Sequence, residues 1–246
     1  MAVTLLASVF FVSKIALADQ ASFSGRELIS EPNIRVGLYK TNLAVKFTSE
    51  FPYEVWSGDR SRGVIPAGES VSLSYKNGLY TVKSASVEFS AADYFRLVPE
   101  DSRNFFILTS YQRLVAGRKK INFNAYRGTL EYRYAPKSKL PYIINELPLD
   151  SYVAGVAEIY DSAPIEYIKA LMVAARSYAY SNISKLPPTE KRMFDVYPTT
   201  MDQIYLGYNS ELFMPRTAQA AADTAGEMVT YKGSPVPTPY FSNSNG

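Results

Sequence analysis

The spacing of apolar residues changes along the chain, and this change constrains the fold class most strongly. In the first half, apolar side chains stand at every second position, as at Ile34, Val36 and Leu38, which is typical of half-buried strands. In the second half they recur every three or four residues, which is typical of helices packed on one side. The sequence therefore predicts an α+β protein, in which a strand-rich region (residues 31–125) packs against a core of helices and short strands (residues 126–246).

Two turn signals divide the predicted strands. Asn77 and Gly78 can occupy the two positive-φ positions of a type I′ turn, so the sequence around them predicts a tight hairpin. Lys232 and Gly233 predict a second hairpin near the end of the chain. Prolines on the second arm of this hairpin favour an edge strand.

Three helices are expected in the second half. The first follows Pro148, with one apolar stripe formed by Tyr152, Val153, Val156 and Ile159. The second begins with Pro164 in its first position, and its stripe is formed by Ile165, Ile168, Met172, Ala175 and Ala179. The third spans about Thr217–Ala225 and ends at Gly226, a residue that suits a helix terminus.

The composition excludes several kinds of chemistry. The 246-residue chain has no cysteine and no histidine, so it has no disulfide, no thiol nucleophile, no imidazole base and no histidine-rich zinc site. Catalysis would have to use carboxylates, lysines, hydroxyls or a metal bound by oxygen. A net charge of +3 is too small to favour nucleic-acid binding. The 20 tyrosines can stack on sugar rings or fill half-buried strands.

The first residues resemble a targeting segment. An apolar run is followed by the small-x-small sequence Ala16-Leu17-Ala18, as at a secretory cleavage site, so residues 1–18 predict a signal peptide. Lys14 interrupts the run too early for a transmembrane helix, although an uncleaved anchor stays an alternative. We therefore expect an extracytoplasmic protein that is secreted, periplasmic or associated with the cell wall, and that contacts a membrane only through this segment.

Five sequence blocks of the second half occur in the order and spacing of a known family. The blocks are YRGTLEY, NELPLDSYVAGVAE, PIEYIKALMVAARSYAY, FDVYPTTMDQIYLG and MVTYKG…PYFSNSNG. Together they resemble the SpoIID/LytB family of stage II sporulation proteins D and amidase enhancers. The resemblance covers residues 127–246, about half of the chain.

The resemblance implies a role on peptidoglycan and assigns Glu158 as the catalytic residue. Members of this family act as lytic transglycosylases on glycan strands without stem peptides, or stimulate a partner amidase. A lytic transglycosylase needs one acid–base residue, because the muramyl 6-hydroxyl replaces water as the attacking group. Residues 153–157 are apolar, and loss of water there favours the protonated acid. Without the family pattern, Glu158 would be interpreted as an exposed side chain near a helix end.

Arg176 has two interpretations. It lies between apolar and small residues, where a cation requires a partner. It either orients Glu158 or binds an acetamido or lactyl group, or it forms a structural salt bridge with Asp195 or Glu146.

The same blocks provide further candidates for substrate binding. These are Ser177, Tyr178, Gln203, Tyr205, Ser242, Asn243 and Ser244, together with Arg176. The amide of Gln203 and the phenol of Tyr205 match the Gln-x-Tyr of the family, and such groups can hydrogen-bond to N-acetyl groups and stack on sugar rings. Tyr178 is either a residue of the cleft or part of the core.

The chain departs from the family pattern in its last blocks. Some members carry cysteine and histidine there and bind zinc, whereas here Met201 and Asp202 precede the glutamine and Phe241 stands where histidine is common. We therefore expect no metal and no cofactor. The family normally continues beyond the position of Gly246, so we expect a chain truncated at its carboxy terminus.

Three functions remain to be distinguished. The first is a lytic transglycosylase that cleaves denuded glycan strands, which requires Glu158 to be partly buried with Arg176 and Gln203 nearby. The second is a non-catalytic wall-binding enhancer of a partner N-acetylmuramoyl-L-alanine amidase. The third is a structural assembly protein in which side chains fill the cleft, so that Tyr205 and Ser242 cannot reach Glu158.

Overall fold

The computed structural model describes residues 31–115, 121–183 and 193–240. Residues from Glu31 onward form one compact unit, and the regional boundary expected near residue 125 lies inside it. The expected signal peptide lies outside the described residues, as do Ser242, Asn243 and Ser244. Among the described residues, no helix combines the length and the apolar character that a membrane span requires.

The first sheet combines strands from both halves of the chain. Within the described residues it has six antiparallel strands, in the order β1 (Asn33–Lys40), β12 (Leu140–Pro148), β11 (Thr129–Ala135), β8 (Phe95–Pro99), β3 (Tyr53–Ser57) and β4 (Arg60–Ile65). Ile34 and Val36 are fully buried, as their alternation predicts. β1 pairs with β12 along its whole length, so the amino-terminal strand supports the strand that leads to the first helix.

The second sheet is also antiparallel. Its six strands within the described residues are β10 (Ala125–Arg127), β9 (Phe105–Ile107), β2 (Val45–Ser49), β5 (Val71–Lys76), β6 (Leu79–Lys83) and β7 (Glu88–Ala91). The predicted hairpin joins β5 to β6, with φ angles of 52° at Asn77 and 82° at Gly78. The type I′ turn is therefore confirmed.

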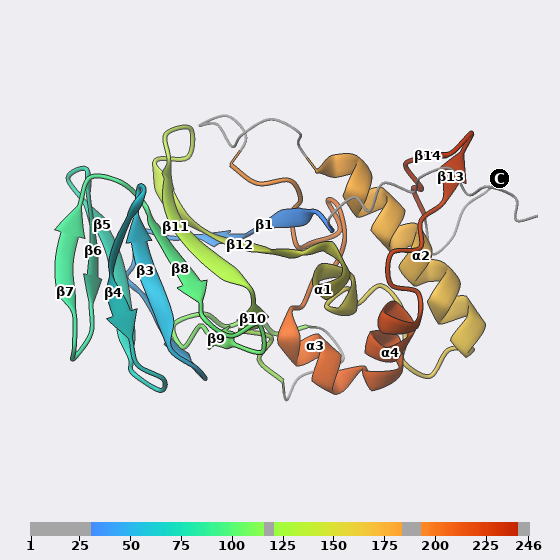
Figure 1. Ribbon diagram of the computed structural model, residues 1–246, viewed down its shortest axis with the longest axis horizontal. Helices are drawn as coiled ribbons and strands as arrows, with labels where there is room; N and C mark the ends of the chain where they lie inside the picture. The colour runs from blue at the N-terminus through green and yellow to red at the C-terminus, as the bar shows by residue number, and fades with distance from the viewer. Residues whose placement is uncertain (1–30, 116–120, 184–192, 241–246) are drawn as a thin grey trace, which may run out of the picture. The chain divides into compact units, whose positions relative to one another are not determined.

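The helices lie in the second half and confirm the α+β class. They are α1 (Leu149–Ala154), α2 (Ile165–Asn182), α3 (Tyr208–Phe213) and α4 (Pro215–Asp223), and the hairpin of β13 (Thr230–Tyr231) and β14 (Ser234–Pro235) follows them. In Figure 1 the helices lie beside β1 and β12, away from β5, β6 and β7. α2 buries Ile168, Met172, Ala175 and Ala179, as predicted. Pro164 is the residue that precedes this helix rather than its first member.

The first helix is shorter than the apolar stripe predicts. It ends at Ala154, so the buried residues Val156 and Ile159 belong to the irregular segment that follows. Gly155 follows the last helical residue, and a β-carbon at this position would lie 2.5 Å from the ring of Tyr205. The chain leaves the helix at this close approach, and Glu158 therefore lies in the segment beyond it.

A cluster of charges on the first sheet holds the segment that leads to the functional site. Arg35 pairs with Glu131 and with Glu146 at 2.5 Å each, and Arg96 pairs with the same two carboxylates at 3.2 and 3.3 Å. Neighbouring antiparallel strands place these opposite charges side by side. Arg35 also donates from Nε to the carbonyl oxygen of Met193, at 2.9 Å. The cluster thus fixes the beginning of the segment that ends at residues 203–206.

Candidate functional site

Glu158 lies where two irregular segments pair. Val156 forms an antiparallel bridge with Tyr205, and the backbone nitrogen of Ala157 donates to the carbonyl oxygen of Ile204 at 2.8 Å. The backbone nitrogen of Ile204 in turn donates to Oε1 of Glu158 at 2.6 Å. The side chain of Glu158 is half-buried. One carboxylate oxygen is therefore fixed by the backbone.

Gln203, the neighbour of Ile204, is fully buried and bound on several sides by the protein. Its Oε1 accepts a hydrogen bond from the hydroxyl of Tyr152 at 3.0 Å. Its Nε2 donates to the carbonyl oxygen of Ala175 at 3.2 Å and to the hydroxyl of Tyr240 at 2.8 Å. Gln203 therefore joins α1 and α2 to the end of the described chain. Its predicted contact with N-acetyl groups stays a prediction.

The charge of Glu158 affects the pKa of the two tyrosines that bind Gln203. Burial raises the pKa of Tyr240, and the carboxylate of Glu158 raises it further. Burial also raises the pKa of Tyr152, and the charge of Glu158 acts in the same direction. Both phenols thus keep their protons at neutral pH and lie within electrostatic reach of Glu158.

Arg176 is bound by several groups of the protein. Its side chain is 1% exposed and its Nε pairs with Oδ1 of Asp150 at 2.5 Å. Nη1 and Nη2 donate to the carbonyl oxygens of Glu227 and Ala221 at 3.1 and 3.0 Å. The ion pair that the sequence predicts is present, but its partner differs from those expected. Glu146 instead belongs to the charge cluster on the first sheet.

Ser177 and Tyr178 connect α2 to neighbouring segments. The buried hydroxyl of Ser177 donates to the carbonyl oxygen of Val173 and accepts from the backbone nitrogen of Val229, both at 2.8 Å. The half-buried Tyr178 donates to Oδ1 of Asp202 at 2.9 Å. Burial raises the pKa of Tyr178, and this hydrogen bond adds to the effect. Tyr178 therefore holds the segment that contains Gln203.

Tyr205 belongs to the interior. Its side chain is 1% exposed, and its hydroxyl donates to Oδ1 of Asn145 at 2.9 Å. Its ring stacks on that of Tyr152, with 4.9 Å between the centroids. Its hydroxyl is directed toward Asn145 of β12, and its predicted contact with sugar rings stays a prediction.

The structure brings together residues that the sequence did not single out. Tyr152 was predicted as part of an apolar stripe, yet its hydroxyl binds Gln203. Tyr240 lies two positions before the predicted Ser242 in the same sequence block, and this position could have indicated that Tyr240 belongs to the site. Asp150 lies in the first turn of α1, where acidic residues are common because they interact favourably with the helix dipole. Its position therefore did not indicate that it pairs with Arg176.

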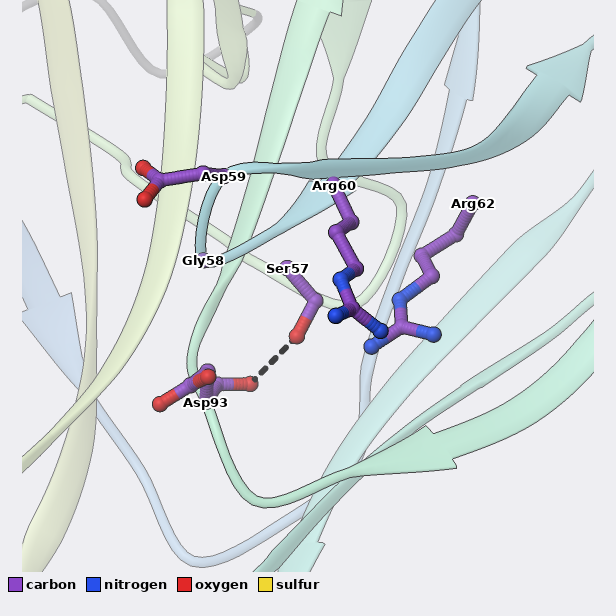
Figure 2. A pocket seen from close by; sticks show the side chains of 6 residues that line it. All are labelled: Ser57, Gly58, Asp59, Arg60, Arg62 and Asp93. Atoms are coloured by element: carbon purple, nitrogen blue, oxygen red, sulfur yellow. Dashed lines mark hydrogen bonds between the residues drawn. The ribbon is translucent and has the colours of Figure 1, made fainter.

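Two features of the described residues concern binding sites away from Glu158, namely metal ligands and a surface hollow. Within them, no three side chains of the aspartate, glutamate, cysteine or histidine type gather where a metal ion could bind. A hollow of about 340 Å³ opens at the turn between β3 and β4. Figure 2 shows the guanidinium groups of Arg60 and Arg62 side by side in it, with Asp59 and Asp93 directed elsewhere. None of the predicted site residues lines this hollow.

Comparison with known proteins identifies a family for the segment around Glu158. The SpoIID family, described as stage II sporulation protein, matches residues 138–231. The matched segment includes Glu158, Arg176 and Gln203, and it ends before Tyr240.

Curated relatives match about half of the chain. An uncharacterized protein of Brachyspira hyodysenteriae is 37% identical over 124 residues, which are 50% of this chain and 32% of that protein. Stage II sporulation protein D of Bacillus subtilis is 30% identical over 127 residues, which are 47% of this chain and 36% of that protein. The corresponding protein of Bacillus amyloliquefaciens is 28% identical over 118 residues, 42% of this chain and 33% of its own length. The chain thus spans about a third of the length of these relatives.

Proposed function

Because the chain belongs to the SpoIID family through residues 138–231, we propose that it is a lytic transglycosylase that cleaves peptidoglycan strands lacking stem peptides. Family membership supports a role related to sporulation or to the cell wall. The observation that carries the finer proposal is the setting of Glu158. It is a half-buried carboxyl group with one oxygen held by a backbone N–H and with two protonated phenols nearby.

The proposed mechanism uses Glu158 first as an acid and then as a base. The hydrogen bond from Ile204 holds Oε1, which leaves Oε2 to carry the proton. The protonated Glu158 donates this proton to the glycosidic oxygen as the bond from that oxygen to the muramyl anomeric carbon breaks. The resulting carboxylate then takes the proton of the 6-hydroxyl of the same sugar as its oxygen bonds to the anomeric carbon. The product is a 1,6-anhydro ring, and no water is consumed.

The test compares the wild-type protein with Glu158→Gln. Both are incubated with glycan strands from which the stem peptides have been removed, and the products are analysed by mass spectrometry. Since glutamine cannot supply or accept the proton, we expect 1,6-anhydro-muramyl ends from the wild type and at least about a hundredfold fewer from the variant.

Glu166→Gln is the matched control. Glu166 is exposed in the first turn of α2, so this change alters the net charge equally without touching the site. It should leave the yield of anhydro ends unchanged. If the folded wild type produces no such ends, or if Glu158→Gln produces as many as the wild type, the transglycosylase proposal is wrong.

A non-catalytic enhancer of a wall amidase is the second candidate. It is supported by the burial of several side chains that were predicted to bind the substrate. Under the enhancer proposal, these side chains do not position a sugar for catalysis at Glu158, because they are bound within the protein. Arg176, Ser177, Gln203 and Tyr205 are all fully buried and hydrogen-bonded to other protein groups. The enhancer proposal expects co-sedimentation with denuded glycan strands that survives Glu158→Gln, and faster amidase hydrolysis of intact peptidoglycan by either form.

Both candidates require an extracytoplasmic location. The proposed partners are glycan strands and, for the enhancer, the amidase, with membrane contact through an uncleaved amino-terminal segment. Fractionation of cells that produce the tagged chain tests the location. Recovery in the cytoplasm would contradict both candidates.

A further inference from the structure

The hydrogen bonds of Gln203 determine the direction of a short chain of donors and acceptors. The group that faces the carbonyl oxygen of Ala175 must carry a hydrogen, so it is the amide nitrogen. This orientation directs Nε2 toward the hydroxyl of Tyr240 and leaves Oε1 to accept from Tyr152. Tyr152 thus donates to Gln203, and Gln203 donates to Tyr240.

The hydroxyl proton of Tyr240 takes no part in these hydrogen bonds. Its oxygen accepts the hydrogen bond from Gln203, and a phenol has one further hydrogen to donate. Within residues 31–115, 121–183 and 193–240, no hydrogen bond donated by Tyr240 is present. The preceding hydrogen bonds polarise this O–H group, because each donor in such a chain becomes stronger when its own oxygen accepts.

Two consecutive residues connect Tyr240 to the catalytic candidate Glu158. Gln203 and Ile204 are consecutive residues, and the first binds Tyr240 while the second binds Glu158. The carboxylate of Glu158 also acts to raise the pKa of Tyr240, so the two groups lie within electrostatic reach of each other. The ring of Tyr240 is half-buried, so it is anchored in the core and still reachable from solvent.

We propose that Tyr240 is a substrate-contacting residue whose hydroxyl donates a hydrogen bond to an oxygen of the glycan bound at Glu158. This inference rests on the proposed function and adds a specific contact to it. A glycan strand offers acceptors at its hydroxyl, acetamido and ring oxygens, which suits an uncharged donor. The hydrogen bond would fix the position of the sugar relative to the carboxyl group, while Gln203 and Tyr152 hold the donor in place.

Tyr240→Phe tests the contact because it removes the hydroxyl and keeps the ring. We expect kcat/KM for denuded glycan strands to fall about tenfold, the usual cost of one lost hydrogen bond to a substrate. In the Glu158→Gln background, calorimetry should show a similarly weaker affinity for the same strands. Tyr167→Phe is the control, since that tyrosine is 60% exposed on α2, and it should change neither quantity.

Tyr152→Phe separates a glycan contact from a purely structural role. It removes the donor behind Gln203 but leaves the hydroxyl of Tyr240 in place. Because this hydroxyl is the group that meets the substrate, we expect a smaller loss than in Tyr240→Phe. An equal loss in both variants would mean that the effect passes through Gln203, and the proposed contact would be wrong.

The outcomes distinguish this inference from the proposed function. If the wild type cleaves glycan strands and Tyr240→Phe does so equally well, the inference is overturned and the proposed function stands. If the wild type binds without cleaving, the transglycosylase proposal is wrong, and an unchanged affinity of Tyr240→Phe for the strands also overturns the inference. If it neither binds nor cleaves, the proposed function and the inference both fail.

Discussion

The strand-rich region and the site region use buried tyrosines differently. Tyr53 of β3 is fully buried between the rings of Phe47 and Phe106, at 6.0 and 5.0 Å between centroids, and within the described residues its hydroxyl has no hydrogen-bond partner. Tyr205 is equally buried, but its hydroxyl binds Asn145. The first tyrosine acts as a large apolar ring. The second is part of a polar network.

This difference shows how each region is stabilised. Alternating apolar side chains hold the sheets together, so a buried hydroxyl such as that of Tyr53 contributes little there. In the site region, buried polar groups satisfy one another, and removal of one group leaves its partners without hydrogen bonds in a medium of low polarity. Mutations of similar size should therefore have different effects in the two regions.

The largest expected effect is loss of the fold at alkaline pH, because it involves both regions at once. Burial raises the pKa values of Tyr53, Tyr126, Tyr152 and Tyr205 above their ordinary value of 10.0. Above pH 10 the unfolded chain releases these protons while the folded protein retains them, so the free energy of unfolding falls as the pH rises. Tyrosinate absorbance and far-ultraviolet circular dichroism should change together. Complete ionisation of the tyrosines with unchanged dichroism would contradict the comparison.

Arg176→Met should have the largest effect of the single substitutions. The side chain is buried, and its loss leaves Asp150 and two carbonyl groups without their partner. We expect the free energy of unfolding to fall by about 3 kcal/mol, as for other broken buried ion pairs. Urea unfolding measures the change. Arg103→Met is the control, because its ion pair with Asp101 is exposed and the substitution should leave the unfolding curve almost unchanged.

The sequence predicted those features that depend on local spacing. The turn at Asn77 and Gly78 and the buried face of α2 follow from rules that involve a few neighbouring residues. The end of α1 did not, because it depends on the approach of Gly155 to a ring 50 residues away in sequence. The short helix α3 was missed for a similar reason, since six residues provide less than two turns of apolar pattern.

The sequence indicated candidate residues for the site but not the contacts that they make. The family pattern led to Glu158, Gln203 and Arg176, which lie within the matched segment. Their partners depend on tertiary pairing, and several acidic residues could have satisfied Arg176 equally well on sequence grounds. The same limit applies to Gln203, whose spacing predicts an amide near the site but not that Tyr152 and Tyr240 occupy its two ends.

Tyr205→Phe should have an intermediate effect. The substitution leaves Oδ1 of Asn145 without the hydroxyl donor, although Nδ2 of that residue keeps its bonds to the carbonyl oxygens of Arg127 and Thr129. We expect the free energy of unfolding to fall by about 1–2 kcal/mol, measured by urea unfolding. An unchanged stability in Tyr205→Phe would mean that this hydroxyl contributes no more than that of Tyr53.

Tyr53→Phe should have the smallest effect. The ring packing against Phe47 and Phe106 is kept, and the hydroxyl that is lost has no hydrogen-bond partner within the described residues. Removing a buried polar atom of this kind relieves its desolvation, so we expect a free energy of unfolding that is unchanged or higher by up to about 1 kcal/mol. The same urea titration that is used for Tyr205→Phe gives a direct comparison. A loss as large as in Tyr205→Phe would show that Tyr53 also satisfies a partner, and the two regions would then not differ in this respect.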